Sequence, residues 1–121
     1  MLRSGHLVFF ISLILSSCNT LHIIDKPITY DEERKQLSLD YLENRYSIIK
    51  NEPSIEPQMI VVHWTAIPDF EKSFNAFKQS KLPNSRPDIT DASPLNVSAQ
   101  FLVGQDGKIY RLLPETAMAR H

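Results

Sequence analysis

An apolar run that ends in a histidine stands near the middle of the chain. Residues 58–64 read QMIVVHW, with three consecutive β-branched residues and turn-prone sequence on both sides. The run has the length of a strand and shows no polar alternation, which is typical of a strand covered on both faces. It therefore predicts a buried central strand over Gln58–Trp64, with His63 at its carboxyl end.

Two amphipathic helices are expected, one before and one after this strand. The first begins at a T-x-x-E capping box formed by Thr29 and Glu32, and apolar residues recur at helical spacing to about Lys50. The second follows Asp69 as a candidate N-cap. Its aromatic residues fall at i, i+4 and i+7: Phe70, Phe74 and Phe77. Such a stripe is typical of core packing, so we assign it no functional role.

A long loop and a hairpin are expected after the second helix. Residues Leu82–Leu95 hold three prolines and several Asn, Asp and Ser residues, which fits a binding loop or lid and an idle surface insertion equally well. Two strand-like runs follow at 96–104 and 108–114, and the Asp106–Gly107 pair between them is a strong hairpin signal. The order of these elements predicts an α/β fold with a mixed β-sheet and flanking helices.

The N-terminus has the pattern of an export signal. Arg3 precedes an apolar run and a group of small residues, and residues 15–18, LSSC, resemble the lipobox of bacterial lipoproteins. This predicts a lipoprotein signal peptide at 1–17, lipidation of Cys18, a tether at 18–28 and a domain at 29–121. Cys18 is the only cysteine and has no disulfide partner within the chain. The alternative is a signal followed by an incidental cysteine.

The charge balance bears on possible partners. Without residues 1–17, whose only charged residue is Arg3, 12 basic and 14 acidic residues remain, a net charge of −2. No basic stripe is present to neutralise phosphates, which argues against a nucleic-acid partner. A lipid on Cys18 would instead hold the domain at a membrane of the bacterial cell envelope, facing the periplasm or the exterior, without spanning it. The oligomeric state is left open.

Histidines are the candidates for chemistry. Of the four, His6 lies in the expected signal and His22 in the expected tether, which leaves His63 and His121. The carboxyl end of a central strand is where α/β folds gather ligands, so His63 is placed to be a metal ligand or a general base. A histidine satisfied within the structure is the alternative.

Two blocks of sequence resemble one known family. The blocks IVVHWTA, at 60–66, and NVSAQFLVGQDGKIYRLLPETAMARH, at 96–121, are similar to those of the N-acetylmuramoyl-L-alanine amidase family, which includes phage lysozyme-type amidases and peptidoglycan recognition proteins. The resemblance covers roughly Gln58–His121. It implies an amidase-like or peptidoglycan-recognition-like domain of which the chain holds the N-terminal part, incomplete at the C-terminus.

The resemblance also implies a reaction and a cofactor. Relatives use zinc-activated water to cut the amide between N-acetylmuramic acid and the L-alanine of the peptidoglycan stem peptide. His63 matches the first zinc ligand. The family's other two ligands, a histidine and then an aspartate or cysteine, lie in a later block that nothing in this sequence matches, and its catalytic glutamate also lies beyond. No catalytic residue is therefore identified, and the 121 residues alone are expected to be inactive or nearly so.

Two further residues are assigned to the substrate by resemblance. The MARH context of His121 resembles the family's AWH turn, which borders the substrate groove; direct metal binding and a plain terminal position are the alternatives. Gln100 stands where many relatives have a histidine, and the tyrosine that could stabilise an oxyanion is absent there. Its amide can donate a hydrogen bond into the groove, or it can face outward from the strand.

Three functions remain open from the sequence. The first is a zinc-dependent peptidoglycan amidase. The second is a lipid-anchored protein that binds peptidoglycan without cutting it. The third is an inactive fragment that folds poorly, because an incomplete sheet exposes edges and apolar faces.

Overall fold

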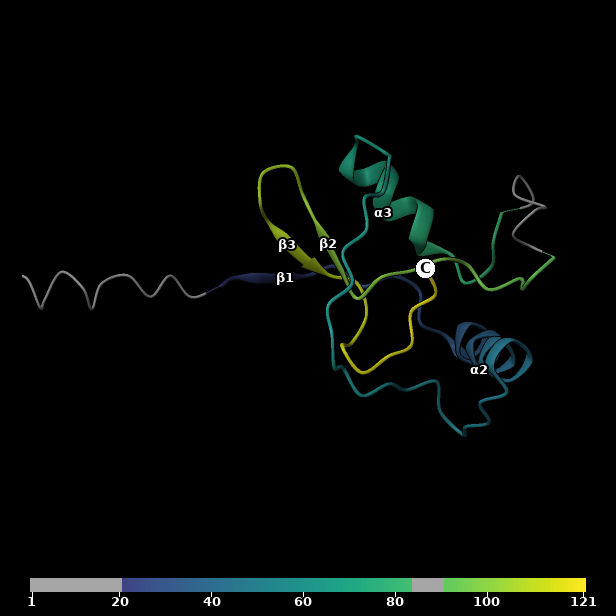
Figure 1. The fold of residues 1–121 in the computed structure, drawn as a ribbon. Coiled ribbons are helices and arrows are strands. Elements are labelled where there is room, and N and C mark those ends of the chain that lie inside the picture. Colours follow the sequence, from purple (N-terminus) through teal and green to yellow (C-terminus); the bar gives the residue numbers. More distant parts are fainter. Residues whose placement is uncertain (1–20, 84–90) are drawn as a thin grey trace, which may run out of the picture.

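A computed structural model describes residues 21–83 and 91–121, and it contains two helices and three short strands (Figure 1). In chain order these are β1 (Ile23–Asp25), α2 (Glu32–Tyr46), α3 (Phe70–Lys78), β2 (Phe101–Val103) and β3 (Ile109–Arg111). The mixed α/β class expected from the sequence is confirmed.

The three strands form one mixed sheet in the order β1-β3-β2. Central strand β3 pairs in parallel with β1 and antiparallel with β2, so that Tyr110 lies opposite both Ile24 and Leu102. The hairpin between β2 and β3 turns at the expected place, where Gly107 has a φ of 79° and its N–H donates to Gly104 O at 2.9 Å. A positive φ favours glycine, which has no Cβ to clash.

Strand β1 lies within the segment expected to be a tether. Ile23 and Ile24 are half-buried, and after the strand Lys26 N and Ile28 N donate to Arg111 O and Leu112 O, each at 3.0 Å. The ordered domain in the described part of the chain therefore begins several residues before Thr29. Cys18 lies outside the described residues.

Helix α2 starts two residues later than the capping box proposed from the sequence. Its N-cap is Asp31, whose carboxylate accepts the N–H of Arg34 at 2.8 Å. Thr29 does not cap the helix; its N–H donates to Lys78 O at 3.1 Å. The helix ends at Tyr46 rather than near Lys50, because Ser47 takes a left-handed conformation with a φ of 56°.

Helix α3 begins as expected, with the carboxylate of Asp69 accepting the N–H of Lys72 at 2.8 Å. Its phenylalanines face the main hydrophobic core, as the spacing predicts. The fully buried members of that core are Ile28, Phe74, Leu102, Leu112, Leu113 and Ala117. A second cluster, Leu42, Leu95 and Met118, packs beside helix α2.

The carbonyl end of α3 is capped by residues from distant segments. Arg34 is 1% exposed, and its Nη2 donates to Phe77 O at 2.9 Å. Asn96 Nδ2 donates to both Ala76 O and Gln79 O at 2.9 Å. The last carbonyls of a helix have no partner within it, so these two side chains join α2 and the 93–98 segment to α3.

The prediction of a buried central strand over Gln58–Trp64 is wrong. This segment has no strand in the structure, and its apolar side chains face solvent: Ile60 is 92% exposed, Val62 89% and Trp64 89%. No backbone hydrogen bond joins it to another described segment. An apolar run gains stability on burial, but a buried strand also needs neighbours for its N–H and C=O groups, and the described residues supply none.

The long loop expected over Leu82–Leu95 is described only at its two ends, and the rest lies outside the described residues. Those ends are joined, because Leu82 N donates to Pro94 O and Asn96 N to Ser80 O, each at 2.9 Å. In residues 21–83 and 91–121, neither helix is long and apolar enough to cross a membrane.

Candidate functional site

His63 and His121 lie together, although most of the domain separates them in sequence. Their ring centroids are 4.7 Å apart, with an angle of 50° between the ring planes. Both residues are exposed. Two exposed imidazoles in contact are available to a metal ion, a proton or a substrate.

The segment that carries His121 is anchored on several sides. Arg120 is buried, its Nη1 donates to Ser93 O at 3.0 Å and to Leu95 O, and its guanidinium lies 5.0 Å from the ring centre of Tyr41. The carbonyl of Arg120 accepts the N–H of Ser98 at 2.6 Å. His121 therefore follows directly on a fixed residue.

Gln100 also binds the segment that leads to His121. Its Nε2 donates to Ala117 O at 2.8 Å, and its backbone carbonyl accepts the N–H of Leu112 at 2.8 Å. The side-chain oxygen remains an acceptor, and the residue is half-buried. Within the described residues, the amide nitrogen that was expected to reach into a groove is directed at the backbone leading to His121.

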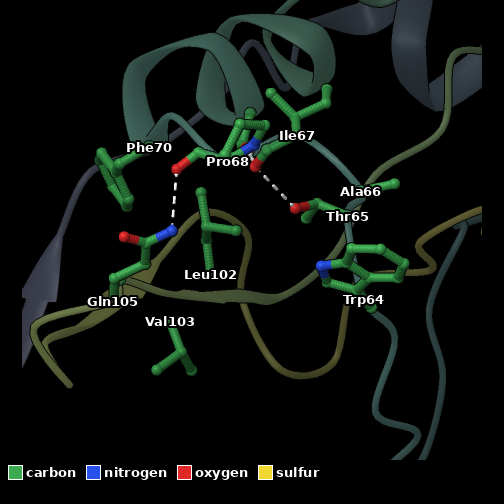
Figure 2. Close-up of a pocket in the computed structure, with 11 residues that line it drawn as sticks. Trp64, Thr65, Ala66, Ile67, Pro68, Phe70, Leu102, Val103 and Gln105 are labelled. Carbon is green, nitrogen blue, oxygen red and sulfur yellow. Dashed lines mark hydrogen bonds between the residues drawn. The ribbon is translucent and has the colours of Figure 1, made fainter.

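A cavity of about 500 Å³ opens between the segment that follows His63, the start of α3 and the β2–β3 hairpin (Figure 2). Trp64, which follows His63, lies on one side of it, Gln105 of the hairpin lies on the opposite side, and Leu102 lies between them. Ile67, Pro68 and Phe70 form the wall at the start of α3. Small-molecule sites in proteins have volumes of roughly 300–1,000 Å³ and mostly apolar linings, so the cavity has the size and character of a ligand site.

The wall of the cavity is built by a bend in the chain after Trp64. Ala66 has a φ of 57°, a left-handed conformation that is uncommon for residues other than glycine. Thr65 Oγ1 and Ser73 Oγ then donate to Ile67 O at 3.3 and 3.2 Å, and Gln105 Nε2 donates to Pro68 O at 3.0 Å (Figure 2). The bend and these bonds hold the segment against α3 and the hairpin.

On the hairpin side of the cavity, Gly104 lies against the Asp106 side chain. A Cβ at that position would lie 2.6 Å from Asp106 Oδ1, well inside contact distance. The side chain and backbone N–H of Lys108 both donate to the Asp106 carboxylate and lower its pKa below the usual value. Lys108 therefore holds the Asp106 side chain at the hairpin tip, and a side chain at 104 would make that carboxylate shift.

The described residues contain no group of three His, Cys, Asp or Glu side chains that could hold a metal ion. His63 and His121 are two nitrogen donors, whereas a catalytic zinc site has three protein ligands and an open position for water. In the described ranges the two histidines alone do not complete such a site.

The sequence pattern predicts neither the cavity nor the position of Trp64 beside it. The signal was present: Trp64 is the only tryptophan, and it stands between the histidine and the polar turn at 65–66. The apolar run before it instead predicts that Trp64 ends a buried strand. For His121 the resemblance favours a groove position and leaves metal binding as an alternative, and the contact with His63 appears only in the structure.

Comparison with protein families matches residues 53–121, more than half of the chain, to the family described as N-acetylmuramoyl-L-alanine amidase. The matched range contains the histidine pair, Gln100, helix α3, the hairpin and the cavity. Comparisons with curated proteins and with solved structures gave no match.

Proposed function

Because the chain belongs to the N-acetylmuramoyl-L-alanine amidase family, we propose that it acts on peptidoglycan, at the amide between N-acetylmuramic acid and the L-alanine of the stem peptide. The observation that carries this proposal is the family match over 53–121, which includes both histidines of the exposed pair. A substrate lying across that pair would have its sugar and its peptide on opposite sides of the scissile bond.

The family is generally zinc-dependent, and we assign His63 to the metal. When bound, zinc supplies a water of lowered pKa and polarises the scissile carbonyl. The described residues do not fit a complete catalytic zinc site, because only His63 and His121 come together. A third donor would have to come from outside residues 21–83 and 91–121.

His121 and Gln100 have supporting roles in the proposal. The exposed imidazole of His121, 4.7 Å from that of His63, is placed to hydrogen-bond the substrate near the amide. Gln100 holds the preceding backbone through Ala117 O, and its side-chain oxygen can accept a hydrogen bond from the substrate. Both residues would orient the substrate without taking part in bond breaking.

A second candidate function is peptidoglycan binding without hydrolysis. The presence of only two metal donors in contact among the described residues favours it. In either case we infer that Cys18 carries a lipid and that the domain is held at a membrane of the bacterial cell envelope. That inference depends on the LSSC sequence at 15–18.

One experiment separates the two candidates. The full chain is mixed with purified peptidoglycan sacculi, with and without a chelator, and both co-sedimentation and new L-alanine amino termini are measured. His63→Ala is compared with His22→Ala, which removes an exposed histidine far along the chain from the site. Chelator-sensitive release that His63→Ala abolishes and His22→Ala spares supports the amidase.

The other outcomes are equally informative. Co-sedimentation that survives chelation and His63→Ala, without release of amino termini, supports the binding function. If the chain neither binds sacculi nor releases amino termini, the assignment to peptidoglycan is overturned. Lipidation is tested separately, by metabolic labelling with a fatty acid in wild type and in Cys18→Ser.

A further inference from the structure

The indole of Trp64 is an unusual feature of the cavity. It is 89% exposed and lines a cavity of about 500 Å³, with the buried side chain of Leu102 between it and Gln105 (Figure 2). A large aromatic surface left in water is unfavourable in the free protein, and its cover by a ligand regains that free energy. Tryptophan is also enriched among the residues that dominate binding energy.

The chemistry of the lining indicates which half of the substrate fits. Every residue that lines the cavity is uncharged, including those that supply its polar atoms, Thr65, Ser73 and Gln105. On the two sides of the scissile amide, the muramoyl sugar is uncharged once its lactyl group is in amide linkage, whereas the peptide ends in carboxylates. Burying a carboxylate without a cation is costly, so this lining favours the sugar.

The arrangement of polar and apolar groups also suits a sugar ring. A hexosamine has apolar C–H faces and a polar rim of hydroxyl and acetamide groups. The C–H bonds of one face can lie on the electron-rich face of the indole. Gln105 uses its Nε2 to bond Pro68 O, which leaves its side-chain oxygen as an acceptor for a hydroxyl, and Thr65 Oγ1 can also accept.

The histidine pair and the cavity are joined through one segment of the chain. Trp64 directly follows His63, which contacts His121. We propose that Trp64 is the stacking platform for the N-acetylmuramoyl ring and that the adjacent cavity is the sugar subsite. This inference depends on the peptidoglycan function proposed above.

The single tryptophan provides a direct test, since all tryptophan emission from the chain comes from Trp64. The full chain is titrated with muramyl dipeptide, with N-acetylglucosamine and with the same dipeptide lacking the sugar. We expect a saturable shift of the emission to shorter wavelength with the two sugar-bearing probes, stronger for muramyl dipeptide, and no shift with the free dipeptide. A shift caused by the free dipeptide would overturn the sugar assignment.

Variants are compared by calorimetry and by binding to sacculi, which do not depend on fluorescence. Trp64→Ala is expected to weaken binding of muramyl dipeptide about tenfold, and Trp64→Phe, which retains a smaller ring, about threefold. Ile60→Ala is the matched control, because Ile60 is 92% exposed in the same segment and does not line the cavity. It should bind like wild type.

The failures can be told apart. If wild type binds sacculi and Trp64→Ala binds equally well, the sugar platform is wrong and the peptidoglycan function stands. If Ile60→Ala weakens binding as much as Trp64→Ala, the whole exposed segment is the contact and the specific role of Trp64 is overturned. If wild type does not bind sacculi, both proposals fail.

Discussion

Two apolar regions of similar composition have opposite environments. Leu112 and Leu113, which follow strand β3, are 1% and 2% exposed, whereas Ile60 and Val62 are about 90% exposed. Leu112 and Leu113 each donate a backbone hydrogen bond to Gln100 O, while the backbone of 58–64 has no partner in the described residues. Hydrophobicity determines how much free energy an apolar segment gains on burial. Whether the segment is buried also depends on neighbours that pair with its backbone N–H and C=O groups.

The largest expected effect is that of truncating the buried side of this comparison. Leu112→Ala should lower the free energy of unfolding by about 3 kcal/mol, because it removes packed methyl groups and leaves a cavity. Ile60→Ala should change it by less than about 0.5 kcal/mol. Urea unfolding followed by far-ultraviolet circular dichroism measures both. Equal losses would mean that the 58–64 segment is buried in solution.

A smaller decrease in the free energy of unfolding is expected when a polar side chain of the packed region is removed. Asn96→Ala removes two hydrogen bonds to the carbonyl end of α3, to Ala76 O and Gln79 O, in a position that is 2% exposed. We expect a loss of about 2 kcal/mol, since buried carbonyls then lack a donor. The exposed Asn75→Ala, on the same helix, is the control and should be nearly neutral. A neutral Asn96→Ala would show that water replaces the amide.

The N-cap of α2 should contribute about 1 kcal/mol to the free energy of unfolding. Asp31→Ala should lower that free energy by this amount in the same urea measurement. The pKa of Asp31 is lowered by the N–H of Arg34 and the hydroxyl of Ser80, which donate to its carboxylate. A lowered folded-state pKa means that the stabilisation from its charge is present above the unfolded value, about 4, and is lost as the pH falls through the folded value.

The variant Asp31→Asn isolates this pH dependence, because asparagine also caps helices but does not titrate. The difference in stability between wild type and Asp31→Asn should narrow as the pH is lowered below about 4. A constant difference across that pH range would contradict the assignment.

The smallest effect is expected in hydrogen exchange, because local opening of the exposed 58–64 segment should cost almost no free energy. The amides of Ile60, Val61 and Val62 should exchange with solvent deuterium almost as fast as in an unfolded peptide, because no described group accepts from them. The amides of Leu112 and Asn96, which bond to Gln100 O and Ser80 O, should be protected. Slow exchange of the 60–62 amides in solution would contradict this prediction and would reveal a partner strand. When muramyl dipeptide is added, these amides should still exchange fast.

The elements set by local sequence were predicted well. The phenylalanine spacing and Asp69 identify helix α3, and Asp106–Gly107 identifies the hairpin, because caps and turns depend on residues close in sequence. The start of α2 was misplaced because both Thr29 and Asp31 are good caps, and the tertiary bond from Ser80 to Asp31 is not visible in the sequence. The family expected from resemblance is confirmed by the match over 53–121.

What failed depends on contacts between distant residues. The 58–64 run has the composition of a buried strand, and only the arrangement of the other strands shows that it has no neighbour. Strand β1 is three residues long, too short to stand out, and is defined by its pairing with β3. In the candidate site, His63 was found from its place after the apolar run, but its contact with His121 and the cavity beside Trp64 require the folded chain.

The pairing of β1 with β3 has a consequence for the time at which the fold can form. Asp25 and Arg111, which are paired across these strands, are 86 positions apart in the chain. At a synthesis rate of about 5 to 20 residues per second, β1 waits roughly 4 to 17 s for its partner to be made. Because β3 is the central strand, no part of the sheet can form before then, and β1 stays without its partner while most of the domain is made.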